Sequence, residues 1–94
     1  MQEIVLSGAN WTTPEDFYNA LLPSLGAPSW HGHNLDALWD SILGNDINQI
    51  KPPFRIQIDG IDAMSSECKA LVDRFAALIN EAKDQGVMVE IVRP

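Results

Sequence analysis

Hydrophobic and polar positions along the 94 residues repeat with two periods. Residues 2–7 form a short apolar run that ends at Gly8, and residues 54–59 alternate apolar and polar. Both patterns predict strands, the second with one buried face. Residues 87–92 are nearly all apolar, which predicts a third strand buried on both faces. Between these runs, apolar residues recur every three or four positions, as in amphipathic helices.

The first helix is predicted to begin after Thr13. Thr13 suits an N-cap, Pro14 suits the first helical position, and Asp16 stands where the acid of a capping box would. Pro23 lacks an N–H and would clash with the carbonyl four residues earlier. We therefore expect this helix to end or kink near Leu22, and residues 26–33 to form a loop.

The second helix is predicted from about Leu35 to Leu43, with Asn34 as its N-cap and Gly44 as its stop. A helical projection separates this segment into two arcs. The apolar arc holds Leu35, Leu38, Trp39, Ile42 and Leu43, and the outer arc holds Asp36, Ala37, Asp40 and Ser41.

The last helix is the most regular, with a cap at Ser65 or Ser66, an apolar face that includes Cys68, and an end at Gly86. The order is then strand, helix, helix, strand, helix, strand. Helical crossovers favour parallel pairing with right-handed connections. We predict an α/β fold, a small three-stranded parallel sheet with three to four helices packed on it, as a single domain over residues 1–94.

The net charge of −7 is distributed unevenly along the chain. Residues 1–50 contain six acids and no lysine or arginine, whereas the other 44 residues contain seven acids and six bases. Such unbalanced negative charge favours a positively charged partner. It argues against direct binding of nucleic acid, which needs basic residues to release counterions.

Other features of composition predict where the protein works. No apolar run has the length of a membrane span, and the N-terminus lacks the basic region of a signal peptide. The single cysteine, Cys68, excludes an internal disulfide and suits the reducing cytoplasm. We expect a cytoplasmic protein that does not bind membranes and is monomeric when free.

The outer arc of the second helix carries two acids at a spacing that is unfavourable by itself. Asp36 and Asp40 are four residues apart, where like charges destabilise a helix by about 0.2–0.5 kcal/mol. No lysine or arginine is close enough in sequence to relieve this repulsion. Trp39 can pack inward with one edge and offer the other to a partner. Trp30, in a loop, is either an interface anchor or a cover over the core.

A metal site is the competing interpretation of the same stretch. His31, His33, Asp36 and Asp40 could bind a metal in a small metal-dependent enzyme. The pattern has no third histidine, and nearby residues of these types arise easily by chance. The chain also lacks a phosphate-binding loop, a Gly-x-Ser-x-Gly elbow and a Cys-x-x-Cys pair. We predict no metal, no cofactor and no enzymatic activity.

One long motif resembles the barstar family, the intracellular inhibitors of secreted microbial ribonucleases. The motif is Gly32-x-Asn34-Leu35-Asp36-Ala37-Leu38-Trp39-Asp40 and ends in Gly44. A weaker match is Glu81-Ala82-Lys83-x-x-Gly86. The resemblance implies a partner-binding face in which Asp40 is the main anchor and Asp36 supports it. Its other members would be Trp30, His31, Asn34, Trp39, Gly44 and Glu81.

Three positions in or directly beside the motif depart from the family pattern. His31 replaces a tyrosine, His33 replaces a glutamate, and Asn45 replaces an aromatic residue. Because these positions lie at the implied contact, the resemblance points to a different partner or a modified interface.

The predicted function is inhibition of a basic ribonuclease toxin, bound one-to-one and blocked at its active site, as by an immunity protein. Immunity to a DNase or a transfer-RNA-cleaving toxin, the metal-dependent enzyme, and a scaffold for another basic protein remain alternatives.

Overall fold

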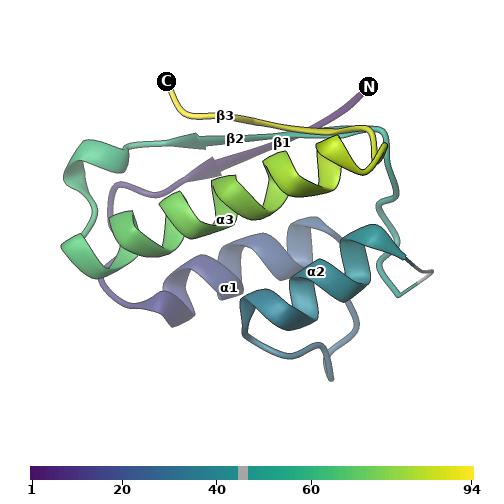
Figure 1. Cartoon of the computed structure of the whole chain (residues 1–94). Helices are drawn as coiled ribbons and strands as arrows, with labels where there is room; N and C mark the ends of the chain where they lie inside the picture. The colour runs from purple at the N-terminus through teal and green to yellow at the C-terminus, as the bar shows by residue number, and fades with distance from the viewer. Residues whose placement is uncertain (45–46) are drawn as a thin grey trace.

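A computed structural model describes residues 1–44 and 47–94 (Figure 1). The described residues form three strands and three α-helices in the predicted order, and one short 3-10 helix that was not predicted. In chain order they are β1 (Gln2–Ser7), α1 (Pro14–Ser24), α2 (Leu35–Leu43), β2 (Phe54–Asp59), η1 (Ile61–Ala63), α3 (Ser66–Asp84) and β3 (Val89–Val92).

The three strands form a parallel sheet in the order β1-β2-β3, which confirms the predicted fold class. Ile4 pairs with Ile56, and Ile56 pairs with Ile91. Successive strands are added in one direction across the sheet, so crossovers of the usual right hand place all connecting helices on the same face. Figure 1 shows α1, α2 and α3 on one side of the sheet.

The other face of the sheet is open, and this corrects the prediction for the last strand. β3 lies at the sheet edge, with Val89 buried but Val92 exposed. Its apolar sequence predicted cover on both faces, but the strand order leaves no helix for the outer face. Arg55 of β2 stabilises that face, because its guanidinium bonds Glu3 of β1 and Glu90 of β3, each at 3.0 Å.

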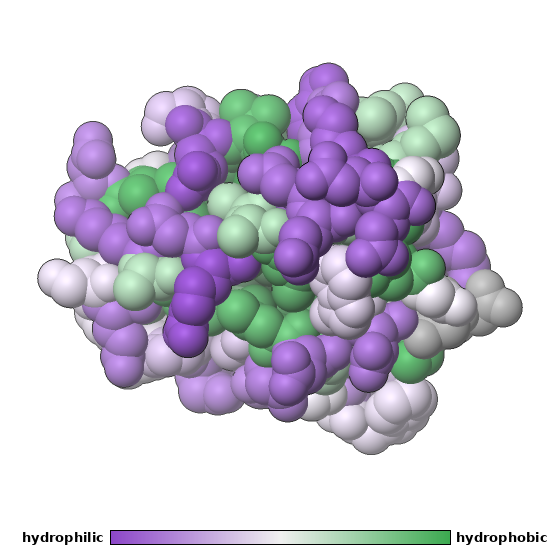
Figure 2. Space-filling model, in the orientation of Figure 1, coloured by the Kyte–Doolittle hydropathy of each residue, from purple (hydrophilic) through white to green (hydrophobic). Residues whose placement is uncertain are grey.

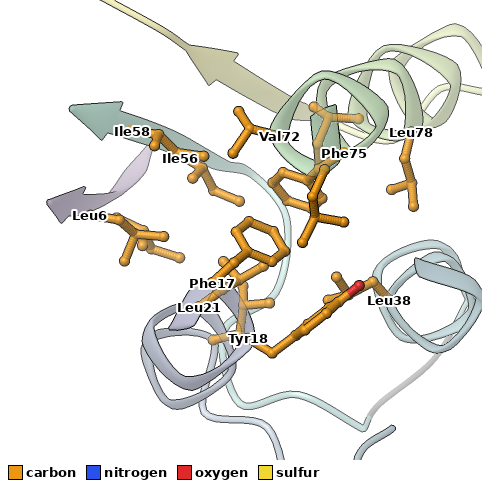
Figure 3. Packing of buried hydrophobic residues seen from close by; sticks show 14 of the residues in the cluster. Leu6, Phe17, Tyr18, Leu21, Leu38, Ile56, Ile58, Val72, Phe75 and Leu78 are labelled. Atoms are coloured by element: carbon orange, nitrogen blue, oxygen red, sulfur yellow. The ribbon is translucent and has the colours of Figure 1, made fainter. Parts of the chain in front are cut away.

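The core lies between the sheet, α1 and α3, and α2 closes one side of it (Figure 3). Phe17 of α1 and Phe75 of α3 are fully buried and meet edge to face, with ring centroids 5.2 Å apart. Leu38 of α2 points into the space between these two helices. Burying a side chain of this size contributes about 1.5–3 kcal/mol, so this contact holds α2 in place.

The start of α3 agrees with its prediction, whereas the end of α1 differs from its prediction. Ser65 caps α3, accepting the Cys68 N–H at 3.1 Å, and Cys68 is buried as predicted. α1 ends at Ser24, two residues after the predicted end or kink near Leu22, so Pro23 lies inside the helix. The missing N–H of Pro23 is tolerated in this last turn, where Leu25 N–H still bonds the carbonyl of Leu21 at 3.0 Å. In the described residues, no helix is both long enough and apolar enough to span a membrane.

The start of α1 provides a pH-dependent test of the fold. The Asp16 carboxylate accepts the backbone N–H groups of Thr12, at 2.8 Å, and Thr13, at 3.2 Å. These hydrogen bonds lower the pKa of Asp16 below its ordinary value of 3.8. The unfolded chain therefore takes up this proton first. The stabilisation is complete above about pH 5, begins to fall near 3.8, and is lost as the pH falls through the lower pKa of Asp16 in the folded protein.

We expect Asp16→Asn to lower the melting temperature at neutral pH, and the difference from the wild type to shrink as the pH falls through this window. Thermal unfolding followed by circular dichroism between neutral and acidic pH measures the effect. Asp62→Asn, in η1, is the control for loss of one exposed carboxylate. A difference that is independent of pH would contradict the proposed role of Asp16.

Candidate functional site

The second helix presents its two carboxylates to solvent, as predicted. Leu38 and Ile42 are buried, whereas Asp36 and Asp40 are exposed. The Asn34 side chain caps the helix by accepting the Ala37 N–H at 2.7 Å. This cap and the two buried residues fix both the start of α2 and its rotation, and thereby the direction in which the acids point.

One residue of the predicted outer arc is not at the surface. Ser41 is buried, although the helical projection placed it with the two aspartates. The projection assumed that a single side of α2 would be covered. In the fold, His31 from the preceding loop and Asn48 from the following segment pack against Ser41, so α2 is covered on a second side.

The two tryptophans near α2 have different environments. Trp30 is 72% exposed, so it does not fold over the core, and the interface-anchor alternative is the one that its position supports. Trp39 is partly buried and packs against the core, which confirms the prediction that one edge packs inward. The loop that carries Trp30 protrudes below α1 and α2 in Figure 1.

A shallow groove of about 440 Å³ separates α2 from α3. Asp36 and Trp39 line it from α2, and Glu81 lines it from α3. Figure 2 shows a hydrophobic strip along this region, bordered by hydrophilic side chains. The fold therefore brings Glu81 into the same groove as Asp36 and Trp39, which are far from it in the sequence, as the family resemblance implied. Its remaining lining residues are Leu35, Arg74, Ala77 and Leu78.

Arg74 is the residue of this region that sequence reasoning missed. It lines the groove with Asp36 and also a second groove beside Tyr18 and His33. Burial raises the pKa of Tyr18, and the positive charge of Arg74 opposes this shift. Within residues 1–44 and 47–94, Asp36 forms no ion pair with Arg74 or with any other residue. Its carboxylate is therefore not neutralised by direct pairing in this part of the chain.

The two histidines of the loop before α2, His31 and His33, lie in different environments. His31, predicted to lie with the contact residues, is buried, and its Nδ1 lies 2.8 Å from the Gly32 carbonyl. His33 is exposed, bonds Glu15 through Nδ1 at 2.8 Å and stacks on Tyr18. The described residues contain no group of three or more metal-ligating side chains. The metal-site alternative therefore lacks a ligand set among these residues.

The two glycines of the motif have different structural roles. A Cβ on Gly32 would lie 2.9 Å from Nδ2 of Asn34 and 3.2 Å from Cβ of Ala37, so a larger residue would press on the helix cap. Gly44 ends α2 as predicted, with its N–H 3.3 Å from the Asp40 carbonyl, but in a conformation open to any residue. Asn45, one of the departures from the family pattern, lies outside the described residues.

The parallel sheet with helices on one face and an exposed acidic helix define a small α/β protein suited to binding a basic partner. The sequence matches the family model described as "Barstar (barnase inhibitor)" over residues 1–92, and the chain belongs to the barstar family. It is similar to "Putative ribonuclease inhibitor YrdF" of Bacillus subtilis (strain 168). The two share 25% identity over 85 residues, which cover 90% of this chain and 89% of that protein.

Membership of the family confirms several predictions made from the motif. The resemblance and the α/β fold class are confirmed, and the family is one of inhibitors rather than enzymes. At the level of the family, the chain has the role of a ribonuclease inhibitor. The contact residues themselves remain predictions.

The N-cap of α2 supplies a stability test for the site. We expect Asn34→Ala to lower the free energy of unfolding by about 1 kcal/mol, because the Ala37 N–H loses its acceptor. Asn34→Ser, which retains a capping oxygen, is the matched control and should remain close to the wild type. Urea unfolding of the three proteins measures the difference. Equal stability of the alanine and serine variants would contradict the capping role.

Proposed function

We propose that this protein inhibits a basic microbial ribonuclease by placing the exposed side of α2 and the Trp30 loop in the enzyme's active site. In this proposal Asp40 is the main anchor, and Asp36 assists it. Trp30 packs on the enzyme surface, Trp39 and Gly44 flank the contact, and Glu81 reaches its rim. Asn34 acts from within α2, by holding the helix start. Binding is one-to-one, and the inhibitor catalyses nothing.

The observation that carries this proposal is the exposure of both aspartates on a helix whose other side is fixed. Leu38 and Ile42 are buried, so a rotation of α2 that turned its acids inward would expose these two apolar side chains. A rigid helix loses little conformational freedom on binding, which favours affinity. Carboxylates held in this way can replace substrate phosphates among the cationic groups of a nuclease site.

The groove between α2 and α3 supports the participation of Glu81. Because Asp36, Trp39 and Glu81 line one surface, a single basic side chain of a partner could contact residues from both helices. Arg74, at the same groove, limits the negative potential there and favours partners whose positive charge faces Asp40.

The setting of this function is also part of the proposal. We propose a cytoplasmic protein, a single domain over residues 1–94, that is monomeric when free and protects its cell from a ribonuclease toxin. A single buried cysteine is compatible with a reducing compartment. The negative charge of the chain supports binding to a protein rather than directly to nucleic acid.

Inhibition assays with several nucleases test the proposal. The purified protein is titrated into basic bacterial ribonucleases, including barnase and any nuclease encoded beside its gene, and RNA cleavage is measured. Parallel assays with a DNase and with a transfer-RNA-cleaving enzyme distinguish the alternatives. The expected result is stoichiometric inhibition of at least one ribonuclease. Inhibition of only the DNase, or of none of these enzymes, would contradict the proposal.

Asp40 is expected to be the residue whose removal weakens binding most. We expect Asp40→Ala to reduce affinity for the inhibited ribonuclease by at least about 2 kcal/mol, or about thirtyfold, the range of an interface hot spot. Asp62→Ala removes an exposed carboxylate of η1, outside α2, and should leave affinity unchanged. Isothermal titration calorimetry measures affinity and stoichiometry together. Equal affinities for the two variants would rule out Asp40 as the anchor.

Electrostatic attraction should also be visible in the association rate. Raising the ionic strength from about 0.01 M to 0.15 M shortens the Debye length from about 30 Å to 8 Å. We expect the association rate constant to fall by at least about tenfold over this range, with a much smaller change in the dissociation rate constant. Stopped-flow tryptophan fluorescence measures both. An association rate that is independent of salt would contradict electrostatic steering.

A further inference from the structure

Three buried polar side chains of the described residues meet at one place. His31, Ser41 and Asn48 are 5%, 3% and 4% exposed, and no other polar or charged residue in the described parts of the chain is buried. His31 belongs to the loop before α2, Ser41 to α2 itself, and Asn48 to the segment after it. We call these three residues the polar cluster.

The hydrogen bonds of the polar cluster determine which nitrogen of His31 carries a proton when the ring is neutral. Nδ1 lies 2.8 Å from the Gly32 carbonyl oxygen, which can only accept, so Nδ1 carries the hydrogen. With the hydrogen on Nδ1, Nε2 can only accept, and it lies 2.9 Å from Ser41 Oγ. The serine hydroxyl therefore donates to Nε2, which is nearer than its other acceptor, the Leu38 carbonyl oxygen at 3.2 Å. Asn48 Nδ2 donates to the same oxygen at 3.1 Å. Ser41 is thus the centre that joins the two flanking segments.

The polar cluster is poorly explained by stability alone. Oδ1 of Asn48 is buried and has no hydrogen-bond partner in the described chain. A buried polar group without a partner costs about 1–3 kcal/mol, and a well-packed apolar cluster would avoid that cost. Buried polar networks do, however, restrict geometry, because each hydrogen bond is satisfied in only one arrangement. This suggests that the polar cluster fixes a particular arrangement of the chain.

The arrangement that the polar cluster fixes is that of the proposed binding surface. His31 directly follows the exposed Trp30, and its backbone N–H closes a turn on the Pro28 carbonyl at 3.0 Å. Ser41 directly follows Asp40. The hydrogen bond between His31 and Ser41 therefore joins the neighbours of two proposed contact residues, one on a loop and one on a helix.

We propose that His31 is a positioning residue of the binding surface. Through Ser41, it holds the loop of residues 28–33 so that Trp30 keeps a fixed place relative to Asp40. This inference rests on the proposed function, but it assigns to His31 an internal role in place of direct contact with the partner. Removing the imidazole should leave α2 folded and its acids exposed, while Trp30 becomes mobile.

Nuclear magnetic resonance of the free protein tests this role without a partner. In His31→Ala we expect lower heteronuclear NOE values for the backbone N–H groups of residues 29–33 and for the indole N–H of Trp30, with α2 unchanged. Ser41→Ala, which leaves a smaller cavity, should produce the same change. Ile79→Val shortens a fully buried side chain of α3 and is the control for general destabilisation. A loop that stays ordered in both cluster variants overturns the inference.

A double-mutant cycle against the inhibited ribonuclease separates positioning from general destabilisation. We expect His31→Ala to weaken affinity about tenfold in the wild-type background, the effect of losing about one hydrogen bond. In the Trp30→Ala background the same change should weaken affinity by less than about twofold, because there is no indole left to position. Equal losses in the two backgrounds overturn the inference.

The NMR measurement and the double-mutant cycle together distinguish failure of the proposed inhibitory function from failure of the positioning role of His31. If no ribonuclease is inhibited but the cluster variants release the loop, the proposed function fails and His31 is still shown to hold the loop. If a ribonuclease is inhibited and neither arm changes, inhibition stands and the role assigned to His31 is wrong.

Discussion

The packing of α2 against α1 and α3 is the constraint on which the proposed site depends. Leu38 and Ile42 bury the inner side of this short helix, and Asn34 fixes where it begins. Once these contacts form, the opposite side of the helix must face solvent. Asp36 and Asp40 therefore stay exposed because of the core, although their mutual repulsion weakens the helix.

Among the residues that the structure describes, the acids of the first half of the chain do not form one continuous face. Glu3 lies on the open side of the sheet, where Arg55 forms ion pairs with both Glu3 and Glu90. Glu15 accepts a hydrogen bond from His33. α2 lies on the other side of the sheet, and its Asp36 lines the same groove as Glu81. The site is thus defined by which acids are exposed together, whereas net charge contributes mainly long-range attraction.

The loop before α2 shows how stability and geometry can be balanced. In the polar cluster, the buried Oδ1 of Asn48 has no hydrogen-bond partner among the described residues, and Trp30 is left largely exposed to water. Both features are unfavourable for folding, and both suit a surface that must be ready for a partner before binding. A preorganised loop loses less conformational entropy on association, so disorder in the free state would reduce affinity.

The sequence by itself determined the three strands and three α-helices, their order, the cap at Asn34 and the family, because these depend on short-range patterns. It left the cap of α3 open between Ser65 and Ser66. It also identified the acids of α2, since helical periodicity separates them from the core. Tertiary structure alone decided that one sheet face stays open, that Ser41 is buried by His31 and Asn48, and that Arg74 lines the groove. Those outcomes depend on contacts between residues that are distant in the sequence, and local sequence patterns do not predict such contacts.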